Sequence, residues 1–131
     1  MLVFFPRGLP GFEEWQEYYL YQTQPESPFY NLQCQAQPQV SFLLLNPFCF
    51  TQDYEFDLPE AARERLQIED MSDVAVFNIV NPRGGVTSAT VNLQAPVIIN
   101  VRRQLGEQII LEETRYSLRT PLQQLITRGE V

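Results

Sequence analysis

The chain has 131 residues, a length that suits one domain, and 44% of them are hydrophobic, which is typical of a globular protein with its own core. The formal net charge is -7 and every basic residue is Arg, so the surface repels phosphate and direct nucleic-acid binding is not expected. Without His or Lys the chain has no Ser–His triad and no Schiff-base lysine, and two scattered cysteines cannot form a zinc site.

Short β-like runs separated by Pro and Gly follow an N-terminal turn segment, FPRGLPGFEEW. Aromatic-rich, alternating or continuously apolar patterns predict strands over 17–22, 29–35, 39–45, 74–80, 86–93, 97–101, 107–113 and 115–119. The turn sequences NPRGG (81–85) and RRQLG (102–106) predict two hairpins, over 74–93 and 97–113.

Two segments are predicted to be short helices. In the segment 57–66, Pro59 stands early and acidic residues precede Arg. In the segment 120–129, Thr120 would be the N-cap, Pro121 the first helical residue and Gln123 the second member of a capping box. All these elements predict an all-β fold, a small antiparallel β-barrel-like domain over residues 1–131 with one or two short helical segments.

No apolar run approaches the roughly 20 residues of a membrane helix. The start, MLVFFPRG, lacks the basic segment of a signal peptide. We therefore expect a cytoplasmic protein in which Cys34 and Cys49 are free, buried thiols.

The strand pattern is interrupted in TVNLQAPVIIN (90–100). Pro96 cannot donate to a strand ladder, so it belongs at a bulge, a bend or an edge, and Asn92 can bond to the backbone at such a break. We expect the chain to bend at QAP and to continue as 97–101 into the other side of the barrel. Direct contact with a partner is the alternative role for these residues.

The segment QDYEFDL places Asp53, Glu55 and Asp57 at a spacing of two, on one face of an extended chain. Three carboxylates in a row could hold Ca²⁺ or perform acid–base chemistry, and with Tyr54 nearby they could serve a carbohydrate- or metal-binding β-domain. The competing interpretation is a solvated face of an edge strand. No catalytic residue, metal or cofactor is expected.

The acidic residues are concentrated between Asp53 and Asp73, where eight acids face only two arginines and hold six of the seven net negative charges. Such a segment can steer a basic partner, or it can be a solvated surface. The candidate partner-binding acids beyond the QDYEFDL stretch are Glu60, Glu64, Glu69 and Asp70. The aromatic residues Phe48, Phe50, Tyr54 and Phe56 could anchor a partner or fold over one end of the barrel.

Four stretches of the chain, in order, resemble the flagellar assembly factor FliW family: FPRGLPGFEE, VSFLLLNPFCFTQDYEFDL, TVNLQAPVIIN and GEQIILEETRYSLRTPL. None of these stretches is catalytic, and it is their colinearity over nearly the whole chain that carries the resemblance. The residues that the resemblance marks as structural are Gly8, Gly11, Phe12, Pro47, Thr90, Asn92, Leu93, Pro96 and Asn100.

The resemblance implies a non-enzymatic protein with a small β-barrel-like fold. Members of this family bind newly made flagellin in the cytoplasm. When flagellin is exported, the freed protein binds and antagonises the RNA-binding translational regulator CsrA. The expected partners are therefore flagellin and a CsrA-type regulator, with no membrane and no direct nucleic-acid contact.

Overall fold

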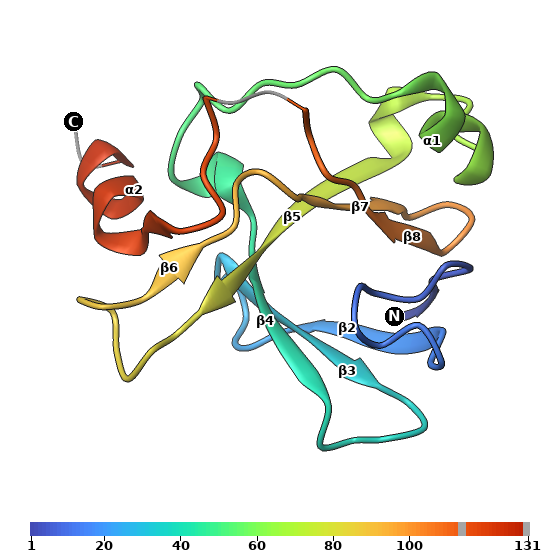
Figure 1. Cartoon of the computed structure of the whole chain (residues 1–131), viewed down its shortest axis with the longest axis horizontal. Helices are drawn as coiled ribbons and strands as arrows, with labels where there is room; N and C mark the ends of the chain where they lie inside the picture. Colours follow the sequence, from blue (N-terminus) through green and yellow to red (C-terminus); the bar gives the residue numbers. More distant parts are fainter. Residues whose placement is uncertain (113–114, 130–131) are drawn as a thin grey trace.

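One mixed sheet of nine strands dominates the described part of the chain, residues 1–112 and 115–129 of a computed structural model (Figure 1). Seven strands close into a barrel in the order β4-β3-β2-β1-β8-β7-β5, because β5 also pairs with β4. The described elements are β1 (Leu2–Phe4), β2 (Glu17–Gln22), β3 (Phe29–Cys34), β4 (Ser41–Leu45), 3₁₀ helix η1 (Pro47–Cys49), α1 (Glu60–Arg65), 3₁₀ helix η2 (Met71–Asp73), β5 (Val74–Asn81), β6 (Thr90–Val91), β7 (Val97–Asn100), β8 (Leu105–Gln108), β9 (Thr120–Pro121) and α2 (Leu122–Gly129).

The all-β, barrel-like fold predicted from the sequence is confirmed, with one exception to its antiparallel order. β1 and β8 pair in parallel, at Phe4 and Leu105. β6 and β9 lie outside the closed ring and extend the sheet from β5, so that α2 packs at this end of the molecule while α1 lies at the other (Figure 1).

The core is divided among three packed clusters of buried side chains. The interior of the barrel is filled from alternate positions of the strands, for example by Tyr18, Leu32 and Ile99, as the strand period of two requires. A second cluster lies beneath α2, whose Leu122 and Leu125 are buried. A third lies beneath α1 and includes the residues Ala62, Leu66, Ile98 and Leu111.

The predicted strands over 17–22, 29–35, 39–45 and 74–80 are confirmed to within two residues. Both predicted hairpins form, but their second strands differ from the prediction. The return from NPRGG pairs only through Thr90 and Val91, and β8 begins at Leu105 and ends at Gln108. The last residue of the predicted strand 107–113 lies outside the described residues.

Two predictions about the C-terminal part of the chain are wrong. The segment 115–119 forms turns and not a strand. Thr120 and Pro121 form β9, paired with Val91 and Thr90, and the helix begins at Leu122, so Pro121 is not its first residue. β1 was not predicted, because three residues carry too little periodicity to be recognised. Cys34 is buried as expected, but Cys49, at the end of the 3₁₀ helix η1, is exposed.

The helix predicted over 57–66 is shorter, Glu60–Arg65. Pro59 is its N-cap, with an extended ψ of 140°, so the helix cannot start earlier. Gln67, with a φ of +55°, turns the chain away just after the C-cap Leu66.

Candidate partner-binding surface

The interrupted strand is an enlarged bulge opposite β5. Phe77 pairs with Val97, and Val80 pairs with Val91, so the five residues 92–96 face only two residues of β5. The break falls where the sequence predicted it, around Pro96. The expectation that the chain crosses to another side of the barrel is wrong, because β6 and β7 both pair with β5. A bulge of this size leaves backbone groups without ladder partners.

Two side chains bond to the first carbonyls of the bulge. The amide Nδ2 of Asn78 donates to the carbonyl oxygen of Asn92 at 2.9 Å, and the hydroxyl of Tyr54 donates to that of Leu93 at 2.6 Å. Asn78 Nδ2 also donates to the Tyr54 hydroxyl at 3.1 Å, so the two side chains act together. Both are buried, and burial raises the pKa of Tyr54 to about 12.

The other carbonyls of the bulge are also bonded. The backbone N–H groups of Leu111 and Ile109 donate to the carbonyls of Gln94 and Pro96, and the Gln108 amide donates to that of Ala95. Asn92 Oδ1 accepts from the Ala95 N–H at 2.9 Å. The interrupted segment TVNLQAPVIIN is thus held by contacts within the chain, which fits the structural role proposed for Asn92 and Pro96.

Asn78 was not predicted as a site residue, although the sequence contains a signal for it. Asn78 stands in the apolar run VAVFNIV, and a polar residue within a buried strand needs a buried partner. The partners lie 14 and 24 positions away along the chain, and one-dimensional periodicity does not identify them.

The aromatic residues of the segment 48–56 divide by exposure. Tyr54 is buried and packs edge-on against Tyr116, at 4.9 Å between ring centroids. Phe50 and Phe56 are half-buried. Phe48 is 49% exposed, so among these four it is the one that offers a large apolar surface to a partner.

The carboxylates of Asp53, Glu55 and Asp57 are exposed, as the spacing of two predicted, although the segment forms no strand. The hydroxyl of Tyr116 fixes the backbone of this segment. It accepts a hydrogen bond from the Glu55 N–H at 2.8 Å and donates one to the Glu55 carbonyl oxygen at 2.6 Å. Across the described ranges, no three acidic or cysteine side chains come together in a group that could hold a metal ion. The three carboxylates therefore form a charged face without a coordination centre.

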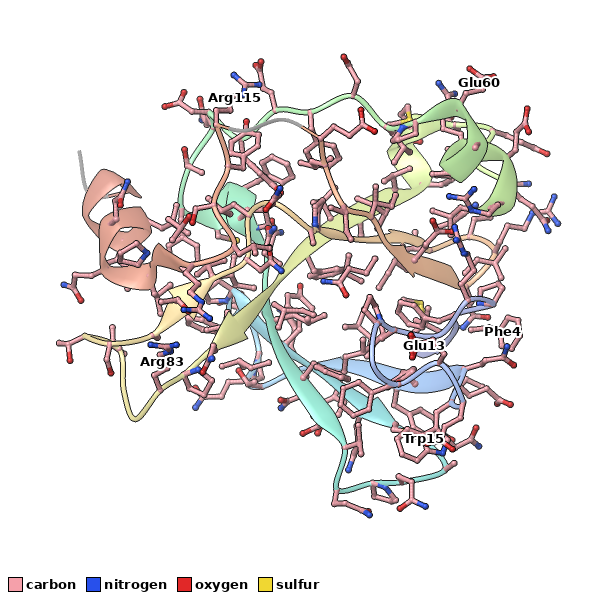
Figure 2. The ribbon with its side chains drawn as sticks, in the orientation of Figure 1. Phe4, Glu13, Trp15, Glu60, Arg83 and Arg115 are labelled. Carbon is pink, nitrogen blue, oxygen red and sulfur yellow. The ribbon has the colours of Figure 1, made fainter. Side chains whose placement is uncertain are left out.

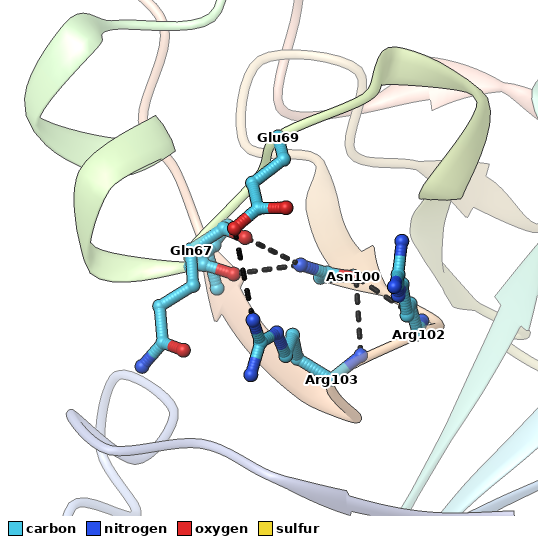
Figure 3. A network of polar contacts seen from close by, with 6 residues as sticks. Gln67, Glu69, Asn100, Arg102 and Arg103 are labelled. Carbon is cyan, nitrogen blue, oxygen red and sulfur yellow. Dashed lines mark hydrogen bonds and ion pairs between the residues drawn. The ribbon is translucent and has the colours of Figure 1, made fainter.

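The acidic segment is partly neutralised by residues distant in the sequence. Arg103 forms an ion pair with Glu69 at 3.7 Å, and Asn100 fastens the same region by donating to the carbonyls of Leu66 and Gln67 (Figure 3). The positive charge of Arg102 acts on the Asp70 carboxylate. A hydrogen bond from the Ser72 N–H to the Asp70 carboxylate, together with the charge of Arg102, holds the pKa of Asp70 below its ordinary value.

Helix α1 is joined to the barrel by a buried carboxylate. Arg65 binds Glu107 with two hydrogen bonds, of 2.8 and 2.7 Å, and Arg7 approaches the same carboxylate at 3.6 Å. Arg65 is therefore occupied by β8 and does not neutralise the exposed acids of α1. Glu60 and Glu64 are exposed and have no ion-pair partner within the described ranges.

The other residues marked as structural lie in turns and core positions. Gly8 has a φ of +63°, and a Cβ there would lie 2.6 Å from the Glu13 Cα, so the opening turn requires glycine. Gly11 also has a positive φ. Phe12 packs against the barrel core, and Pro47 is buried in η1.

Of the candidate partner-binding residues, the structure gathers Phe48, Tyr54, Glu55 and Phe56 around one apolar groove of about 250 Å³. Glu55 and Asp57 also line a wider hollow of about 840 Å³ beside Arg115. Glu60, Glu64 and Glu69 border a third hollow on α1. None of the described helices is long and apolar enough to cross a membrane.

Comparison with known proteins gives consistent matches. A family model described as FliW protein matches residues 1–122. The flagellar assembly factor FliW of Moorella thermoacetica is 44% identical over 123 residues, which cover 92% of this chain and 77% of the relative. The one of Caldicellulosiruptor saccharolyticus is 42% identical over 118 residues, or 90% and 77% of the two chains. A crystal structure of the flagellar assembly factor FliW superposes with a TM-score of 0.84 at 39% identity, covering 92% of this chain and 84% of that one.

Proposed function

This chain belongs to the FliW family of flagellar assembly factors, as its motifs predicted, and we propose that it binds flagellin in the cytoplasm and, when free of flagellin, binds and antagonises a CsrA-type translational regulator. The observation that carries the proposal is the family match across residues 1–122. The family's name denotes an assembly factor, which is a regulatory role and not an enzymatic one.

The surface chemistry supports a protein partner. Flagellin ends are apolar and disordered before assembly, so a binding protein must present apolar surface to them. Phe48 and the groove beside it offer such a surface, and flagellin bound there would displace a regulator that uses the same groove. A basic regulator instead needs negative potential, and the chain has a formal net charge of -7.

Mixing experiments test the proposal directly. We expect size-exclusion chromatography to show a one-to-one complex with flagellin and a separate complex with the CsrA-type regulator, both at micromolar concentrations. Adding flagellin to the regulator complex should release the regulator. Independent elution of the protein and flagellin would contradict the first half of the proposal, and a stable ternary complex would contradict the exchange.

The contribution of the acidic helix to binding the regulator can be measured through association rates. Replacing Glu60 and Glu64 by Gln should lower the association rate and flatten its salt dependence, because exposed charges act mainly on encounter. The dissociation rate should change much less. Glu14 and Glu17 are exposed on the N-terminal loop and β2, so their replacement by Gln changes the net charge equally and is the matched control. Equal association rates for the two double variants would show that α1 is only a solvated surface.

A further inference from the structure

We propose that the groove between the segment 54–58 and the start of β5 holds one apolar side chain of a partner segment that carries Lys or Arg on both sides of it. This inference rests on the proposed function, since it describes how the basic regulator is held. It goes beyond steering by charge, because it assigns the regulator an anchoring contact and names Met71, which the sequence analysis did not mark.

The groove is small and almost wholly apolar. Val74, Val76 and Ile98 from β5 and β7 line it together with Phe56 and Leu58, and Glu55 is its one charged residue. Its volume of about 250 Å³ lies below the range of roughly 300–1,000 Å³ usual for small-molecule sites. A single large side chain is the occupant that this size suits, as at the centre of protein interfaces.

Two exposed apolar residues stand at the groove. Phe48 is 49% exposed and Met71 is 52% exposed. Each lies on a short 3₁₀ helix held by a side-chain cap: Asn46 Oδ1 accepts from the Phe48 N–H at 3.0 Å, and Asp70 Oδ1 accepts from the Ser72 N–H at 2.9 Å. The backbone is thus fixed before binding, while the flexible thioether of Met can adapt to the entering side chain.

The charges around the groove select a basic partner segment. Glu55 lines it, Asp57 follows one residue beyond Phe56, and Asp73 ends the 3₁₀ helix that carries Met71. None of these three carboxylates has an ion-pair partner among the residues that the structure describes. A second copy of this chain would bring the same acids and a further net charge of -7, so charge complementarity favours a partner with Lys or Arg.

The Met71→Asp variant separates anchoring from simple attraction. It adds a negative charge, which would strengthen or preserve a purely electrostatic contact with a basic partner. If the groove takes an apolar anchor, the same change should weaken regulator binding at least tenfold, measured by isothermal titration calorimetry. The side chain is half-exposed, so folding should survive, and a urea unfolding curve checks this. Phe48→Asp should act in the same direction.

The matched control is Val86→Asp. Val86 is 54% exposed and lies in the loop after β5, whereas Met71 begins the 3₁₀ helix η2 that immediately precedes that strand. In Figure 2, Arg83 of this loop lies far from Arg115, which borders a hollow together with Glu55 and Asp57, and far from Glu60 on α1. Binding within twofold of the parent is expected for this variant.

The three possible outcomes that would contradict the inference can be told apart. Unchanged or tighter binding by Met71→Asp, with the parent binding normally, overturns the groove while leaving the proposed function intact. A parent protein that binds no regulator overturns the proposed function, and the groove inference with it. Equal losses in Met71→Asp and Val86→Asp would show that the effect is not local to the groove, and would also overturn it.

Discussion

Replacing Asn78 by Ala tests the bulge network most directly. The variant loses two hydrogen bonds from one buried amide and leaves the Asn92 carbonyl without its donor. A buried polar group left unpaired costs about 1–3 kcal/mol. The small cavity left by the amide adds to this, so we expect a total loss of about 2–4 kcal/mol in the free energy of unfolding.

Urea unfolding followed by circular dichroism measures this loss. The slope with denaturant should stay constant while the midpoint falls, since the surface exposed on unfolding hardly changes. Tyr54→Phe, which removes the hydroxyl that binds Leu93, should cost about 1–2 kcal/mol. Tyr19→Phe is the control, because Tyr19 is 42% exposed, and it should stay within about 0.5 kcal/mol of the parent.

The double variant tests whether the two side chains act as one unit. Asn78 Nδ2 and the Tyr54 hydroxyl lie 3.1 Å apart, so removing both should cost less than the sum of the single losses, by about 0.5–1 kcal/mol. If Asn78→Ala unfolds within about 0.5 kcal/mol of the parent, the bulge is not held by this amide and the reasoning fails.

Three further predictions concern neighbouring features. Asn92→Ala should cost about 1–2 kcal/mol in urea unfolding by leaving the Ala95 N–H unpaired, while Asn92→Asp, which keeps the acceptor, should cost less. Burial raises the pKa of both Tyr18 and Tyr54 to about 12, so stability should be intact below pH 10 and fall between pH 10 and 12; a urea midpoint that is flat across this window would contradict the burial argument. Gly106→Ala should cost about 1–3 kcal/mol by thermal melting, because the added Cβ would lie 2.6 Å from a buried phenyl ring; a melting temperature equal to the parent's would show that the ring moves aside freely.

The strands that the sequence predicted well are those whose burial pattern is local. β2 alternates between exposed and buried positions, and its bounds, Glu17–Gln22, match the prediction. β9 depends instead on a partner far along the chain: Thr120 and Pro121 pair with the two residues of β6. Locally this pair resembles a helix start, and the distant pairing overrides that preference.

The sequence marked candidate residues where charged and aromatic residues are consecutive. Phe48 and Glu55, two of these candidates, line the same groove, and their contact with a partner stays a prediction. Arg103 was not predictable as a neighbour of Glu69, because the hairpin turn that carries it meets the end of α1 only in the folded chain (Figure 3). Net charge counted along a segment therefore overstates the field that the segment produces in space.

Tyr54 shows how binding and stability are joined in this protein. Its ring lines the apolar groove, and its hydroxyl supports the bulge at Leu93. A partner that fills the groove therefore packs against a residue that holds the bulge opposite β5. A large substitution at Tyr54 would lower binding through the fold as well as through lost contact, and it cannot separate the two. Phe48 shares part of this difficulty, since its ring centroid lies 6.2 Å from that of Tyr54. Met71 is half-exposed and belongs to none of the hydrogen bonds that hold the bulge, so a change there separates binding from the fold more cleanly.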